Sequence, residues 1–346
     1  MRKPTIITAA AAVAAAAALL LSGCVAGEGS AAEPASTSTT GVTQGGTLNI
    51  DFATYNPLSL VIKKEGWLEK ALAKQKITVN WVQSAGSNKA NEALRSGAID
   101  VGSTAGSAAL LARSNGSPIK TIDIYSQPEW SAIVVGPNST VTSVKQLKGK
   151  QIAATKGTDP YFFLLQSLEA NGLSANDVTI QNLQHADGWA ALQNGSVDAW
   201  SGLDPIMANA EKSGAKLIYR NVAFNTYGFL NATESFLSSK PDVAQTVVNT
   251  YEHAREWAQK HPEETAKVLS DVAGIDPSVA KTVITERTNL DVSPIPGAAQ
   301  LKVLKKVGPI FVQSGDVKSQ SDIDTALKTL LEPRFVKKAD PSAIGG

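Results

Sequence analysis

The chain has 346 residues, 43% of them hydrophobic, which is enough for two ordinary domains with apolar cores. Its 32 Lys and Arg almost cancel its 31 Asp and Glu, so no basic stripe favours nucleic acid, and a small molecule is the expected ligand. The single cysteine excludes a disulfide framework and a cysteine-ligated metal site.

The first residues are typical of an exported lipoprotein. Two early cations precede an apolar stretch at 6–21, which is short beside the roughly 20 residues of a membrane span. The sequence LSGC at 21–24 resembles a bacterial lipobox. We therefore expect residues 1–23 to be a signal peptide and Cys24 to carry a lipid that anchors the protein outside the cytoplasm, on the cell membrane. An ordinary signal peptide with an incidental cysteine is the alternative.

Residues 24–46 are rich in Ser, Thr, Gly, Ala and Pro, a composition that cannot offset its own ordering entropy, so we expect a flexible tether. Strands and helices then alternate, which predicts two α/β lobes with mainly parallel sheets. The first lobe has expected strands at 47–52, 77–82 and from Ile99, with helices up to Leu72, up to Gly97 and after Ser107. The second has expected strands at 131–135, 151–154, 178–180, 197–199 and 217–219, with helices at 160–170 and 189–193.

Beyond Phe229 the sequence predicts mainly helices, at 241–259, 262–272, 277–287, 296–313 and 322–331. We expect them to return and cover the first lobe. The predicted division is therefore 47–128 with 232–346 for lobe 1, and 129–231 for lobe 2.

One phrase occurs twice. Residues 92–103 are EALRSGAIDVGS and residues 190–201 are AALQNGSVDAWS. In each, a helical run ends at a glycine and an apolar-Asp-apolar triplet follows, which indicates a left-handed helix stop leading into a strand. The repeat predicts two similar lobes, in which Asp100 and Asp198 hold the loops in place.

Open parallel sheets bind ligands beyond the carboxyl ends of their strands, so two facing lobes predict a shared cleft. The loops expected there are 55–57, 103–106, 156–159, 186–188 and 200–204. They lie at helix starts, whose free N–H groups and partial positive charge favour an anion. Lys156 is their only cation, which favours a singly charged oxyanion held by neutral donors.

Several cleft residues have two interpretations. Asp187 and Asp204 either cap helices or contact ligand, and Trp200 is either a pocket wall or part of a core. Thr104 and Thr158 begin helices and are expected to donate to the anion.

The chain resembles the substrate-binding lipoproteins of bacterial ABC importers for aliphatic sulfonates, in the group that also serves taurine, nitrate and thiamine precursors. The motifs that carry the resemblance are GWLEK at 66–70, GAIDVG at 97–102, LKGK at 147–150 with Lys156-Gly157, and GSVDAW at 195–200 with Asp204-Pro205. The resemblance implies an α/β, type II periplasmic-binding-protein fold, with two Rossmann-like lobes, a cleft between them and a two-strand hinge, and it implies an ABC permease and ATPase as partners. The chain departs from similar proteins at two places. Glu129-Trp130-Ser131 replaces a common Ser-Glu pair before the first strand of the second lobe, which concerns the contacts on the hinge side, and the small Ser201 and Gly202 predict a roomier pocket.

The combined prediction is a monomeric receptor for a small alkane- or arenesulfonate, with no cofactor, no metal, no nucleic acid and no catalytic residue. Its expected ligand-binding residues are Tyr55, Asn56, Ser103, Thr104, Trp130, Lys156, Gly157, Thr158, Asp187, Trp200 and Asp204. A receptor for nitrate, taurine or a thiamine-type pyrimidine is the alternative, followed by an enzyme on the same scaffold. Because His185 is the only histidine beside the cleft loops, affinity is expected to vary little with pH.

Overall fold

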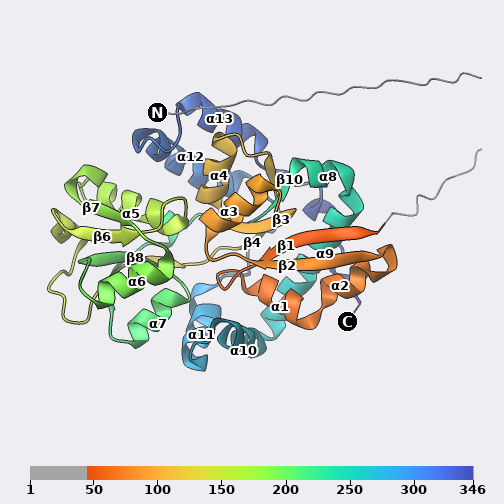
Figure 1. Cartoon of the computed structure of the whole chain (residues 1–346), viewed down its shortest axis with the longest axis horizontal. Helices are drawn as coiled ribbons and strands as arrows, with labels where there is room; N and C mark the ends of the chain where they lie inside the picture. The colour runs from red at the N-terminus through yellow and green to blue at the C-terminus, as the bar shows by residue number, and fades with distance from the viewer. Residues whose placement is uncertain (1–44, 346) are drawn as a thin grey trace, which may run out of the picture. The chain divides into compact units, whose positions relative to one another are not determined.

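Two five-stranded sheets form the centre of the protein in the computed structural model, which describes residues 45–345 (Figure 1). These residues belong to one compact unit. The first sheet has the order β2 (Ile77–Gln83), β1 (Gly46–Phe52), β3 (Val101–Ala105), β10 (Gly228–Thr233) and β4 (Ile119–Ser126). The second has the order β7 (Thr179–Asn182), β6 (Gln151–Ala154), β8 (Ala199–Leu203), β5 (Ser131–Val135) and β9 (Lys216–Arg220).

The sheets have the same topology. When the strands are counted from β1 in one sheet and from β6 in the other, the first strand pairs in parallel with the second and the third. One strand of each sheet, β10 or β5, runs antiparallel to its neighbours. That antiparallel strand is the first one after the chain crosses from the other sheet, at 127–130 and at 221–227. The predicted α/β class with two similar sheets is confirmed, and each sheet is mixed, with two parallel and two antiparallel strand pairs.

The repeated sequence motif forms the same helix-to-strand connection twice. Gly97 and Gly195 both follow a helix in the left-handed region, with φ of 73° and 77°. Asp100 Oδ2 accepts from the Asn49 N–H at 2.8 Å, and Asp198 Oδ2 accepts from the Gln151 N–H at 2.9 Å. Each aspartate therefore ties the third strand of its sheet to the start of the first, as predicted.

Helices cover both sheets. Those of the first half are α1 (Pro57–Glu65), α2 (Trp67–Leu72), α3 (Ser87–Ser96) and α4 (Gly106–Ser114), and those beside the second sheet are α5 (Asp159–Ala170), α6 (His185–Gln193) and α7 (Ile206–Lys212). The C-terminal part contributes α8 (Glu234–Ser239), α9 (Pro241–Lys260), α10 (Pro262–Ala273), α11 (Pro277–Thr282), a π-helical turn (Val283–Arg287), α12 (Ala298–Gln313) and α13 (Gln320–Thr329). The one helix expected up to Leu72 is two, because Gly66 adopts a left-handed φ of 65° between them.

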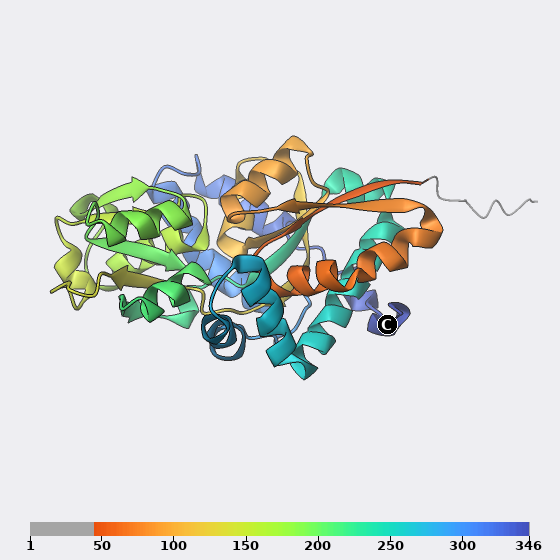
Figure 2. The same cartoon turned by 60° about the horizontal axis from the view of Figure 1, so that its bottom comes forward.

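The C-terminal helices pack on the first sheet and also reach the second lobe. One apolar core joins α1, α2, α9 and α10 to the first sheet. Another runs from α4 through α12 into α5, where the rings of Phe162 and Phe311 lie 4.3 Å apart. Figure 2 shows the blue C-terminal segment beside the junction of the two lobes.

Candidate functional site in the cleft between the lobes

The floor of the cleft is built where the two crossings meet. Trp130, on the first crossing, is 3% exposed and meets the ring of Tyr55 edge-on, with centroids 6.1 Å apart. Trp130 and Thr226, on the second crossing, both donate to the same carboxylate, that of Asp159 at the start of α5. The crossings and the second lobe are therefore bound together at one side chain.

Asp159 accepts four hydrogen bonds. Its Oδ1 receives the hydroxyls of Ser107 and Thr226, both at 2.6 Å, and its Oδ2 receives the Thr226 N–H and Trp130 Nε1–H, both at 2.8 Å. Burial raises the pKa of Asp159, and these donors oppose the rise. Because Ser107 belongs to α4 of the first lobe, the carboxylate joins the lobes directly.

Two helix starts face each other at the mouth of the cleft. α3 of the first lobe and α5 of the second both begin without a side-chain cap. Within the described chain, the N–H groups of Ser87, Asn88, Gly157 and Thr158 have no acceptor. A Cβ built on Gly157 would lie 3.6 Å from Asn88 Cβ, so the two starts are in contact range. Opposed, uncapped helix starts favour an anion between them.

His185 closes one side of the mouth. The Thr155 hydroxyl donates to Leu183 O at 2.7 Å and lies 3.2 Å from His185 Nδ1, so it accepts the Nδ1 proton and Nε2 carries the lone pair. Nε2 has no partner among residues 45–345, and a Cβ on Gly86 would lie 3.0 Å from it. Burial lowers the pKa of His185 to about 4.

The cleft contains a very small cavity behind this mouth, with only about 10 Å³ open to the centre of a water molecule. It is lined by Tyr55, Ser87, Ala105, Trp130, Thr158, Asp159, Pro160 and Leu203. A space of this volume holds about one water molecule, so the lobes are closed tightly on the cleft, and an organic ligand enters it only when they move apart. The lining combines the rings of Tyr55 and Trp130 with the first residues of α3 and α5.

An ion-pair cluster holds the lobes together beside the cavity. Arg287, 7% exposed in the π-helical turn, donates to Asp204 Oδ1 at 3.1 Å and pairs with Glu211 of α7. Burial raises the pKa of Asp204 to about 6, against the lowering effect of Arg287. The single buried cation at this end of the cleft is thus shared by two carboxylates.

Comparison with known proteins agrees with this architecture. Residues 60–265, more than half of the chain, match the NMT1/THI5-like family. The chain belongs to that family. It is 31% identical over 286 residues to a protein of Bacillus subtilis (strain 168) named as an aliphatic sulfonates-binding protein, which covers 81% of this chain and 84% of that protein. A protein of Escherichia coli (strain K12) with the same name is 27% identical over 76% of this chain and 83% of its own length.

Among solved structures, the alkanesulfonate-binding protein of Xanthomonas axonopodis pv. citri, bound to MOPS, superposes with a TM-score of 0.74 at 25% identity, over 83% of this chain and 98% of its own. The resemblance drawn from the sequence motifs and the periplasmic-binding-protein fold are therefore confirmed. In this NMT1/THI5-like chain, Ser87, Asp159, His185 and Thr226 lie inside the matched range, whereas Tyr55 and Arg287 lie outside it.

Five of the predicted residues lie around the cavity or its mouth: Tyr55, Trp130, Lys156, Gly157 and Thr158. The Thr158 hydroxyl donates to Thr155 O at 2.6 Å, so its backbone N–H is the donor left for a ligand. Lys156 is exposed, with Nζ 5.7 Å from the Tyr161 ring.

Three other predicted residues already have protein partners. Ser103 donates its hydroxyl to Asp51, Thr104 donates to Ala105 O and accepts from Asn231, and Asn56 caps α1 and donates to Tyr251. Their binding roles stay predictions, but the hydrogens of both hydroxyls are used within the first lobe.

The remaining predicted residues lie away from the cavity or at its edge. Trp200 is fully buried in the core of the second lobe, packed on Gly188 and 6.1 Å from Trp189, so of its two interpretations the core is the one observed. Asp187 is exposed in the first turn of α6. Asp204 accepts from the Ala208 N–H at 2.9 Å, which caps α7, and pairs with Arg287. Cys24 lies outside the described residues.

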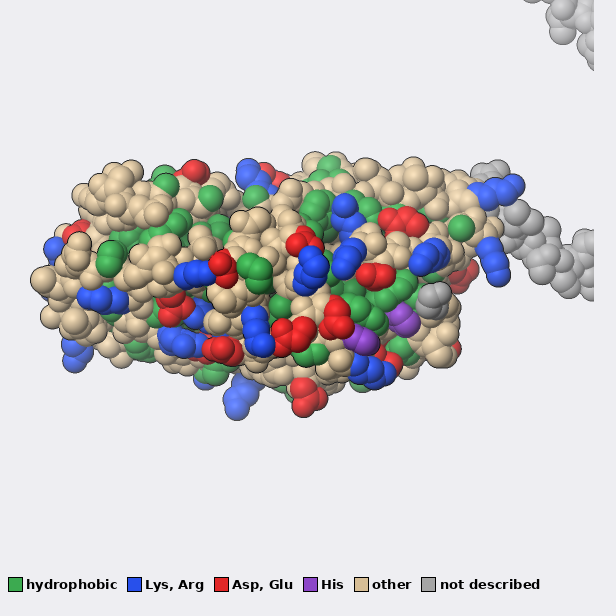
Figure 3. All heavy atoms as spheres, turned by 90° about the horizontal axis from the view of Figure 1, so that it is seen from below, with side chains coloured by type: hydrophobic (Ala, Val, Ile, Leu, Met, Phe, Trp, Pro, Cys, Tyr) green, Lys and Arg blue, Asp and Glu red, His purple; other side chains and the backbone are tan. Residues whose placement is uncertain are grey.

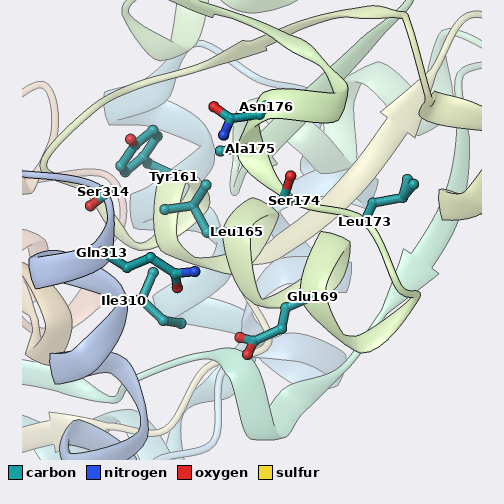
Figure 4. A pocket seen from close by; sticks show the side chains of 10 residues that line it. All are labelled: Tyr161, Leu165, Glu169, Leu173, Ser174, Ala175, Asn176, Ile310, Gln313 and Ser314. Carbon is teal, nitrogen blue, oxygen red and sulfur yellow. The ribbon is translucent and has the colours of Figure 1, made fainter.

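A second hollow lies outside the cleft, in a groove of about 260 Å³ between α5 and α12 (Figure 4). Among the described residues that line it, Glu169 is the one charged side chain, and it is a carboxylate. This groove therefore offers an anion no cation. On the face shown in Figure 3, positive and negative side chains are interspersed, as the balanced composition predicts.

No helix within residues 45–345 combines the length and apolar character needed to cross a membrane.

Proposed function

We propose that this protein is the extracytoplasmic receptor of an ABC importer and binds a small organic sulfonate in the interlobe cleft. The observation that carries the proposal is the pair of opposed, uncapped starts of α3 and α5 beside a small, ring-lined cavity. The family relationship and the relatives named for sulfonate binding support it.

The chemistry of the head group fits these donors. A sulfonate keeps one negative charge over the range in which proteins are folded, and its oxygens only accept hydrogen bonds. Each helix start contributes about half a positive charge, so the two starts together attract an anion. The alkyl or aryl tail then lies against Tyr55, Trp130 and Leu203.

Ligand binding and lobe closure are one event in this proposal. Lobe 1 consists of 47–128 with 232–346 and lobe 2 of 129–231, and they rotate about hinges near 127–132 and 226–232. The closed form then docks on a permease with its ATPase. The receptor works as a monomer without chemical change to the ligand, outside the cytoplasm, with 1–23 as signal peptide, a lipid on Cys24, and 24–46 as tether.

Isothermal titration with ethanesulfonate, butanesulfonate, benzenesulfonate, taurine, nitrate and a thiamine-type pyrimidine tests the ligand class. The matched variants are Ser87→Asp and Ser87→Asn, because Ser87 opens α3, lines the cavity and accepts from the Ala105 N–H at 2.9 Å. The aspartate places a charge at the α3 start and is expected to lower sulfonate affinity about 100-fold relative to asparagine.

Two outcomes contradict the proposal: nitrate or the pyrimidine binding more tightly than every sulfonate, or the two Ser87 variants behaving alike. Mass analysis of the recovered ligand separates a receptor from an enzyme, since only an enzyme converts the compound.

A further inference from the structure

Asp159 places a built-in negative charge inside the cleft. Its side chain is 1% exposed, and its carboxylate belongs to the lining of the cavity. All four of its partners donate, two through N–H groups and two through hydroxyls. The contacts therefore fit the ionised carboxylate.

That charge has no cation beside it. None of the ion pairs formed within residues 45–345 includes Asp159. Arg287, which lies with Trp130 in the lining of the adjoining pocket, is already shared by Asp204 and Glu211. Lys156 is exposed at the mouth. The charge on Asp159 is balanced only by neutral donors and by helix starts.

The helix starts around the cavity provide a limited positive charge. Three of them border it: α3 and α5 at the mouth, and α4, whose Ser107 bonds to Asp159. At about half a charge each, they supply roughly 1.5 positive charges. Asp159 offsets about one of these, which leaves roughly half a positive charge for the ligand. A single ligand charge is partly balanced by this remainder, whereas a second ligand charge lacks a counterpart in a cleft that excludes water.

We propose that Asp159 determines ligand charge: the cleft accepts monoanions and rejects dianions of the same size because closure brings the ligand against this fixed carboxylate. This inference rests on the proposed function and narrows its substrate class to singly charged sulfonates, with inorganic sulfate and disulfonates excluded.

The test uses anion pairs matched in size, methanesulfonate with sulfate and ethanesulfonate with ethane-1,2-disulfonate, titrated calorimetrically into the full-length wild-type protein, Asp159→Asn and Ser107→Ala. Asparagine removes the charge and keeps an acceptor for the two hydroxyls. Ser107→Ala keeps the charge and removes one of its hydrogen bonds, so it reports a purely structural role.

The wild type is expected to bind the monoanion of each pair at least about tenfold more tightly than the dianion. Ser107→Ala is expected to keep this affinity ratio, and Asp159→Asn is expected to reduce it at least about fivefold. Circular dichroism and thermal melts confirm that the variants fold. If Asp159→Asn fails to fold, the other two proteins still decide the matter. A monoanion-to-dianion affinity ratio below twofold in the wild type, or a different ratio in Ser107→Ala, overturns the inference. A tenfold ratio in the wild type that Ser107→Ala keeps supports it. A wild type that binds monosulfonates but binds disulfonates as well refutes this inference alone, whereas one that binds no sulfonate refutes the proposed function and this inference with it.

Discussion

The burial of His185 predicts that ligand affinity falls in acid. Its ring is 2% exposed in the closed cleft, and the cover on Nε2 comes from the loop at Gly86 in the other lobe. Closure therefore buries this nitrogen, and opening returns it to water. The pKa is about 4 in the closed form and close to the ordinary value of about 6.5 in the open form. This revises the expectation from the sequence that affinity varies little with pH.

The sign and size of the effect follow from linkage. A pKa lowered by closure means that the closed form binds fewer protons between pH 4 and 6.5, so affinity is complete above pH 6.5 and is lost as the pH falls through that value. With pKa values of 6.5 and about 4, the dissociation constant rises about tenfold at pH 5.5 and about thirtyfold at pH 5.0.

The assay is calorimetric titration of a monosulfonate between pH 5 and 8, with His185→Asn as the matched variant. Asparagine does not titrate, and its Nδ2–H replaces the Nδ1–H donor to Thr155. The raised pKa of Asp204 acts in the opposite direction, so the ratio of wild type to variant at each pH isolates the histidine. Equal pH profiles for the two proteins refute the reasoning.

Four further predictions concern other contacts. Gly86→Ala should weaken ligand binding about tenfold, because the added Cβ would lie 2.9 Å from Asn88 Oδ1 and 3.0 Å from the His185 ring. Gly136→Ala is the control and should bind like the wild type, because the space around Gly136 is open. Equal affinities for Gly86→Ala and the wild type would exclude a tight mouth. Arg287→Ala should lower the free energy of unfolding in urea by about 3–5 kcal/mol, because it leaves the buried carboxylate of Asp204 unpaired; a loss below 1 kcal/mol contradicts a buried pair. The free energy of unfolding of the wild type should fall, relative to that of Asp51→Asn, by up to about 4 kcal/mol between pH 4 and 8. Burial raises the pKa of Asp51 from 3.8 to about 7, so the folded protein must release that proton as the pH rises. Parallel curves of stability against pH for the two proteins would exclude the shift. Cys24→Ala should move the protein from membrane to soluble fractions, and an unchanged fractionation contradicts the lipid anchor.

The features of the fold that depend on neighbouring residues could be predicted from the sequence. Helix stops, strand starts and their order are encoded within a few positions, which is why the helix-to-strand connections at Gly97 and Gly195 were predicted with their aspartates. β4 and β10 were missed because both are almost wholly buried on both faces, so their residues lack the alternation of a half-exposed strand.

The centre of the site was missed for a different reason. The partners of Asp159 are at 107, 130 and 226, and those of Arg287 at 204 and 211. No local pattern announces such pairs, since they exist only once two lobes meet. Trp200 illustrates the same limit of prediction from sequence. Its place beside a strand follows from neighbouring residues, but the face of the sheet that its ring occupies depends on tertiary packing against Gly188.

The doubled architecture also explains why closure requires a ligand. Closing the mouth buries His185 Nε2 and Asn88 Oδ1 without partners, which costs about 1–3 kcal/mol for each, and it brings the positive ends of α3 and α5 together. An anion between those ends turns the repulsion between them into attraction, because its negative charge attracts both helix starts at once. The uncapped starts of α3 and α5 belong to different lobes, so an anion is held by both only in the closed form. The unpaired groups at the mouth then oppose closure of the empty cleft, and a receptor that must signal occupancy to a permease needs this opposition.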